Sequence, residues 1–187
     1  MTKPAPNQVR VYTIGHSTHQ LDDFTALLKH YGIELLADVR TIPRSRHNPQ
    51  FNGDSLPAFL QTQGIGYRHL QELGGLRHSR ADSPNSGWRN ASFRGFADYM
   101  QTPAFEAAVT DLLQLAAQKA VVLMCAEAVP WRCHRSLIAD ALLVRGAEVM
   151  DIYDLNHAKP HVLNSMARVQ GVTVTYPSSP VTAAEND

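Results

Sequence analysis

Cysteine is scarce in this sequence of 187 residues, which contains two. Two thiols are too few for the disulfide framework of a small secreted domain, so we expect a protein of the reducing cytoplasm. Long hydrophobic runs are also absent, and none approaches the ~20 apolar residues that a membrane span requires. Residues 1–8 are polar and contain proline, unlike a signal peptide. A net charge of zero and 44% apolar residues therefore predict a single globular domain with a full core.

Lysine is the other scarce residue, with four lysines against thirteen arginines. Eight of the arginines lie between Arg40 and Arg94, a stretch that has no lysine and three acidic residues. The planar guanidinium group binds phosphate or carboxylate through two parallel hydrogen bonds, which an ammonium group does not. Each of these arginines alone is more often a solvated loop charge, but the group together predicts an anionic ligand.

Short apolar runs alternate with helical periodicity, which predicts parallel β/α construction. We expect an α/β fold of the Rossmann-like kind, with a single domain over residues 9–176 and disordered tails at residues 1–8 and 177–187. A mostly parallel open sheet of about five strands would carry helices on both faces. The predicted strands cover residues 9–14, 33–39, 66–70, 121–125 and 148–153, with 121–125 at the centre because it is the most apolar.

The 3.6-residue period predicts helices over residues 24–31, 56–63 and 96–118, the last with a break near Pro103. A further helix would have Pro130 in its first turn and end at Gly146. A short helix over 161–168 and an edge strand over 172–176 complete the prediction. Residues 71–94 show neither period, so we expect a lid or a binding loop there.

Polar side chains follow the predicted strands at their C-terminal ends. In an open parallel sheet these ends meet at one edge, and ligands bind outside that edge. The residues placed there are His16, Ser17, Asp38, Arg40, Arg68, His69, Cys125, Glu127 and Asp151. The predicted topology therefore indicates one site built from several strands.

The segment from Cys125 to Arg135 places two thiols, a carboxylate, an imidazole and two guanidinium groups at a predicted strand-to-helix junction. At about 100° per residue, the apolar face of the following helix points close to His134, which should face inward over the sheet edge. The N-terminus of that helix attracts an anion, and Arg132 and Arg135 reinforce it. The position of Cys125 favours its thiolate, whereas Cys133 is more often a small buried hydrophobe.

Three known motifs do not fit these residues. A cysteine phosphatase loop places arginine six positions after the cysteine, but that position is Trp131 and the arginine is Arg132. Cys125 and Cys133 lack the close pairing of structural zinc sites, so no metal is assigned. No Gly-x-Gly-x-x-Gly or Walker motif is present, and the cofactor is unknown.

Several short segments occur in the order of one protein family. They are Thr13-Ile14-Gly15-His16-Ser17, Asp38-Val39-Arg40 with Pro43 and Ser45, Leu73-Gly74-Gly75, Cys125-Ala126-Glu127, Pro130, Cys133-His134-Arg135 and Pro160-His161. With these segments the sequence resembles the domain-of-unknown-function 488 family of bacterial and archaeal proteins, from about residue 10 to 164. The resemblance implies that the polar residues among them form a characteristic set, but it implies no mechanism.

The leading hypothesis is a cytoplasmic α/β enzyme that acts on a small anionic substrate, such as a nucleotide or another phosphorylated metabolite. A carboxylate would act as general acid or base, and Cys125 is either a nucleophile or a packing residue. The catalytic candidates are Asp38, Cys125, Glu127 and His134, and the substrate-binding candidates are His16, Ser17, Arg40 and Arg135.

Two other classes of function fit the same residues. The first is a non-catalytic module that binds nucleic acid or a nucleotide through the loop arginines, with Trp88 and Phe93 as stacking rings. The second is a metal or redox site at the two cysteines. We expect no membrane partner, and the oligomeric state stays open.

Overall fold

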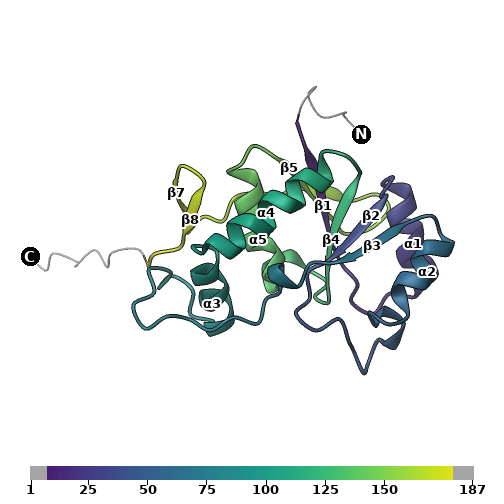
Figure 1. The fold of residues 1–187 in the computed structure, drawn as a ribbon, viewed down its shortest axis with the longest axis horizontal. Coiled ribbons are helices and arrows are strands. Elements are labelled where there is room, and N and C mark those ends of the chain that lie inside the picture. The colour runs from purple at the N-terminus through teal and green to yellow at the C-terminus, as the bar shows by residue number, and fades with distance from the viewer. Residues whose placement is uncertain (1–7, 179–187) are drawn as a thin grey trace, which may run out of the picture.

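The computed structural model describes residues 8–178 (Figure 1). The strands in this range are β1 (Arg10–Gly15), β2 (Leu35–Asp38), β3 (Gly66–His69), β4 (Val121–Cys125), β5 (Glu148–Ile152), β6 (Ala158–Pro160), β7 (Arg168–Gln170) and β8 (Thr173–Thr175). Within the described range the main sheet has the order β3-β2-β4-β1-β5-β6. Its strands from β3 to β5 are parallel, and β6 joins β5 in the antiparallel direction. The predicted α/β class and the mostly parallel, Rossmann-like sheet are confirmed.

Helices cover both faces of this sheet. The α-helices are α1 (Leu21–His30), α2 (Leu56–Thr62), α3 (Ala91–Tyr99), α4 (Pro103–Ala116) and α5 (Arg135–Leu143), and the short 3₁₀ helices are η1 (Pro49–Phe51), η2 (Gln71–Leu73) and η3 (Pro130–Arg132). Helices α1 and α2 pack on one face, while α3, α4 and α5 pack on the other (Figure 1). In the described range no helix is long and apolar enough to cross a membrane.

Strand β4 lies inside the sheet between β2 and β1, as its apolar sequence predicted. All five of its residues are buried. Because successive side chains of a strand point to opposite faces, Val122 and Met124 pack with α1 and α2, and Leu123 and Cys125 pack with α3 to α5. The thiol of Cys125 therefore leaves the sheet on the face that α5 covers.

The predicted helix over 96–118 is two helices, with the break at Pro103 where it was expected. Proline lacks the N–H that would continue the preceding helix, and the hydroxyl of Thr102 accepts a hydrogen bond from the backbone N–H of Phe105, 3.3 Å away. The helix predicted to begin at Pro130 is different: Pro130 opens η3, and Cys133 is extended (φ −133°, ψ 144°). Helix α5 begins only at Arg135.

The predicted helix over 161–168 is wrong. This stretch follows β6 and leads into β7 without an α-helix, and the predicted edge strand over 172–176 is β8, which pairs with β7 rather than with the main sheet. The contacts of His161 with Asp140 and Asp151 hold this segment outside a helix, and such tertiary contacts override local helix propensity. The tails predicted to be disordered lie outside the described residues, apart from Gln8, Pro177 and Ser178.

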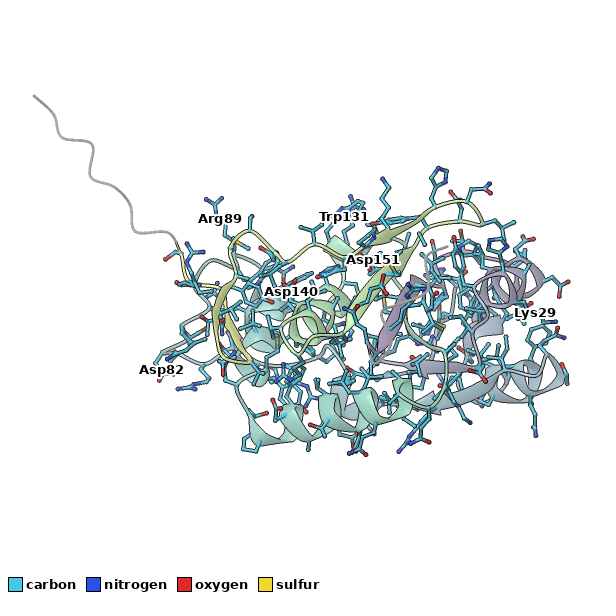
Figure 2. The ribbon with its side chains drawn as sticks, turned by 90° about the horizontal axis from the view of Figure 1, so that it is seen from above. Lys29, Asp82, Arg89, Trp131, Asp140 and Asp151 are labelled. Atoms are coloured by element: carbon cyan, nitrogen blue, oxygen red, sulfur yellow. The ribbon has the colours of Figure 1, made fainter. Side chains whose placement is uncertain are left out.

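His161 is held between two buried carboxylates, those of Asp140 in α5 and Asp151 in β5. Figure 2 labels these two aspartates. The Nε2 of His161 lies 3.1 Å from Asp140 and its Nδ1 lies 2.9 Å from Asp151. The hydroxyls of Tyr176 and Thr13 donate to the other oxygens of the two carboxylates. Burial lowers the pKa of His161, but the hydrogen bonds to both aspartates outweigh it and raise the pKa to about 9. At neutral pH the imidazole is therefore charged and joins α5, β5 and β6.

Candidate active site

A cavity of about 370 Å³ opens where β1, β2 and β4 end. His16 directly follows β1, Arg40 lies two residues after β2 and Cys125 ends β4, and all three line the cavity. Glu127 and His134 line it as well. Four of these five residues were expected here as strand-end residues, and His134 was expected from the direction of its helix face. The other three candidates, Ser17, Asp38 and Arg135, do not line the cavity.

Cys125 is buried and lines the cavity. The guanidinium of Arg135 donates to this sulfur and also to the backbone carbonyls of Glu127, at 2.6 Å, and Ala128, at 3.1 Å. Burial raises the pKa of Cys125, but interaction with the thiol of Cys133 and with Arg135 outweighs burial and lowers the pKa to about 7. A large fraction of Cys125 is therefore thiolate at neutral pH, and Arg135 lies behind this thiolate instead of facing the cavity.

Cys133 also lines the cavity, and its thiol interacts with Cys125. The hydrogen bond to Cys125 and burial raise the pKa of Cys133 well above its usual value. The backbone N–H of Arg135 donates to the sulfur of Cys133 over 3.5 Å. The two cysteines, both free, therefore form an asymmetric pair in which Cys125 carries the charge and Cys133 keeps its proton.

The ring of His134 has a defined tautomer. Its Nε2 lies 3.0 Å from the carbonyl oxygens of both Val39 and Leu73, and since carbonyls only accept, Nε2 carries the hydrogen. Nδ1 is then an acceptor, 3.5 Å from the sulfur of Cys133. Burial lowers the pKa of His134 to about 4, so the ring is neutral. The ring packs on Gly75, where an added Cβ would lie 2.5 Å from Nδ1.

Asp38 does not face the cavity but holds Arg40. Its carboxylate accepts from the backbone N–H of Arg40 at 3.1 Å, from Nε at 2.9 Å and from Nη2. The hydroxyl of Tyr67 donates to the same carboxylate at 2.8 Å. Both oxygens are therefore engaged, and the role that the structure favours for Asp38 is to orient the guanidinium of Arg40 along the cavity wall.

His16 is a buried, neutral histidine beside Arg40. Its ring stacks on Phe51 with centroids 4.3 Å apart, its Nδ1 donates to the carbonyl of Ser17, and its Nε2 accepts from Arg40 over 3.3 Å. Burial, and then Arg40, lower the pKa of His16 to about 4. Ser17 itself has a positive φ of 45° and lines a neighbouring cavity of about 380 Å³. Its side chain therefore does not line the first cavity.

The mouth of the cavity carries exposed charges and apolar side chains. Arg44 makes an exposed 3.5 Å contact with Asp54, while neither Arg132 nor the exposed carboxylate of Glu127 makes a side-chain hydrogen bond within residues 8–178. The apolar residues are Ile42, Leu76 and Phe93. Phe93 was expected only as a ring for base stacking, and Ile42 and Leu76 were not expected here, although apolar residues within an arginine-rich loop are a signal that could have indicated them.

The other predicted strand-end residues lie elsewhere. His69 supports the site indirectly, since its Nε2 donates to the carbonyl of Arg40 over 2.8 Å. Arg68 is exposed and does not line the cavity, and Asp151 belongs to the cluster around His161. The site is therefore built from β1, β2 and β4 rather than from every strand.

The predicted lid over residues 71–94 is an ordered segment whose two ends line the cavity. Its middle is held by the carboxylate of Asp98, which accepts from the backbone N–H of Arg80 at 2.7 Å, the hydroxyl of Ser83 at 2.5 Å and the amide of Asn85 at 2.8 Å. Ser92 and Phe93, at the start of α3, form one side of the cavity.

No group of three or more His, Cys, Asp or Glu side chains with the arrangement of a metal site occurs in residues 8–178. The comparisons with curated proteins and with solved structures give no match. The family model for the domain of unknown function DUF488 matches residues 20–142, most of the chain. That range includes Asp38, Arg40 and the whole segment from Cys125 to Arg135. On this match, the chain belongs to the DUF488 family.

Proposed function

We propose that this protein is an enzyme that uses the thiolate of Cys125 as a nucleophile on a small anionic substrate bound in the cavity. The observation that carries the proposal is the hydrogen bond from Arg135 to the sulfur of Cys125. A guanidinium beside the sulfur favours the thiolate, which is the nucleophilic form of cysteine. Because Cys125 also lines the cavity, a bound substrate lies beside this thiolate.

The charges around the cavity support an anionic substrate. The charged residues that line it within the described range are Arg40, Arg44, Arg132 and Glu127. Arg40 is neutralised by Asp38, but Arg132 has no side-chain partner in the described part of the chain and Arg44 has only an exposed one. A guanidinium without a partner is available for phosphate or carboxylate.

The apolar side chains at the mouth favour a substrate with an apolar or planar part beside its anionic group. Ile42 and Leu76 are 63% and 67% exposed, and Phe93 lines the same cavity. A nucleotide or another phosphorylated metabolite with such a part would bury these side chains on binding.

Proton transfer falls to Glu127 in this proposal. Asp38 is fully engaged by Arg40 and Tyr67, whereas Glu127 is exposed at the cavity mouth. A carboxylate there exchanges protons with both substrate and water. His16 is assigned to orienting Arg40 rather than to proton transfer.

Alkylation of the thiolate by one neutral and one anionic reagent tests the proposal. At pH 7 iodoacetamide is expected to modify Cys125 before Cys133, with a rate that rises to half its maximum near pH 7. In Arg132→Gln the rate with iodoacetate should fall about two- to threefold, the order of effect expected on removing one unit charge near the reacting sulfur in water, and the rate with iodoacetamide should not change. Arg168→Gln, an exposed arginine on β7, is the matched control. Equal effects of both substitutions, or preferential modification of Cys133, would exclude the proposed site.

Nucleic-acid binding by the loop arginines stays a prediction from the sequence. The two rings expected to stack on bases, Trp88 and Phe93, stack on each other with centroids 4.7 Å apart. Trp88 also packs against Tyr176. These contacts occupy ring faces that a base would need, so the cavity is the better supported site.

A further inference from the structure

The two cysteines of the chain, separated by seven residues, meet at one cavity. Both line it and both are free. Arg135 contacts both sulfurs, because its backbone N–H donates to Cys133 and its guanidinium donates to Cys125. Cys133 packs in the core and also lines the cavity beside Cys125. Cys133 is thus placed to react with whatever Cys125 binds covalently.

His134 provides Cys133 with a proton acceptor. The carbonyls of Val39 and Leu73 hold the hydrogen on Nε2, which leaves the lone pair of Nδ1 directed at Cys133, 3.5 Å away. While Cys125 is a thiolate, the S–H of Cys133 interacts with it. Once Cys125 is bonded to a substrate atom it loses its charge, and Nδ1 is the acceptor that remains.

We infer that Cys133 resolves a mixed disulfide formed on Cys125, and that the protein reduces small anionic disulfides. This inference rests on the proposed role of Cys125 as the nucleophile and names its substrate class. The rim arginines, Arg44 and Arg132, bind the anionic group, as in the proposed function.

The reaction balances in two steps. The thiolate of Cys125 attacks one sulfur of R–S–S–R′, the S–S bond breaks, and R′–S⁻ leaves and takes a proton from water. Cys133 then gives its proton to Nδ1 of His134 and attacks the sulfur of Cys125, and R–S⁻ leaves with that proton. The two cysteines are oxidised by two electrons to an internal disulfide, and the substrate disulfide is reduced to two thiols. A dithiol reductant returns the protein to its starting state.

The probe for this inference is 5,5′-dithiobis(2-nitrobenzoate), an aromatic disulfide with two carboxylates that releases a coloured thiolate. Wild type is expected to release two equivalents and to end without an adduct, its intact mass lower by two hydrogen atoms. Cys133→Ser should release one equivalent and keep the adduct on Cys125. In Cys125→Ser the remaining Cys133 should react at least about tenfold more slowly than wild type, because burial still raises its pKa and the Arg135 guanidinium donates at the position of Cys125 rather than to Cys133.

The outcomes separate the inference from the proposed function. If wild type reacts rapidly at Cys125 but retains the mixed disulfide, the inference is overturned and the nucleophile stands. If Cys125→Ser reacts as fast as wild type, the nucleophile itself is wrong.

The role of His134 is tested by His134→Gln, whose amide still donates to the two carbonyls but offers no basic nitrogen. The second release of coloured thiolate should slow at least about tenfold relative to the first, and the loss should be smaller at high pH, where hydroxide removes the proton. An unchanged ratio of the two rates would overturn the assignment of His134.

Discussion

Raising the pH from about 6 to 9.5 should selectively remove the stabilisation that comes from His161. The imidazole donates to Asp140 and Asp151, and its side chain is 8% exposed. Tyr176 and Thr13 complete the hydrogen bonds of the two carboxylates without adding charge. With two acidic partners and little water, the charged ring is strongly favoured in the folded protein.

The magnitude follows from the pKa of His161, which the two aspartates raise from 6.5 to about 9 against the effect of burial. One pKa unit corresponds to about 1.4 kcal/mol, so the contribution to the free energy of unfolding is at most about 3 kcal/mol. The folded state binds this proton more tightly than the unfolded state. The stabilisation is therefore complete below pH ~6.5 and is lost as the pH rises through about 9.

Urea unfolding of wild type and His161→Gln across this pH range measures the effect. The difference between the two proteins is the useful quantity, because Cys125, whose pKa is lowered to about 7 by Cys133 and Arg135 against burial, adds stability with rising pH in both. The difference in unfolding free energy should shrink by up to about 3 kcal/mol between pH 6 and 9.5. A difference that stays constant across the range would refute the ion cluster as the source of this stability.

Three further substitutions test the architecture of the site. Asp38→Asn leaves the buried guanidinium of Arg40 without its counter-charge and should lower the free energy of unfolding by about 3–5 kcal/mol, measured by urea denaturation. Gly75→Ala places a Cβ 2.5 Å from Nδ1 of His134 and should cost about 1–3 kcal/mol by the same measurement; an unchanged midpoint would show that the ring moves freely. Glu127→Gln removes the carboxylate from the cavity mouth, so iodoacetate should alkylate the cavity thiolate about threefold faster while iodoacetamide reacts at the same rate.

The cysteine pair shows what local reasoning about residue types misses. From the sequence, Cys133 is best interpreted as a packing residue on a helix flank. In the structure it is buried but lies at the cavity wall, because the chain is extended at this residue between η3 and α5. The same break moves the start of α5 to Arg135, whose guanidinium then reaches back to Cys125.

The sequence by itself determined the parallel α/β architecture, the interior position of β4 and the meeting of His16, Arg40 and Cys125 at one edge of the sheet. These features follow from hydrophobic periodicity and strand direction, which are local properties of the chain. Only the tertiary structure decided which polar groups are engaged and which are free. Asp38 is committed to Arg40, and His134 turns one nitrogen toward Cys133 because Val39 and Leu73 occupy the other. Hydrogen-bond partners so distant along the chain leave no local pattern from which to predict them.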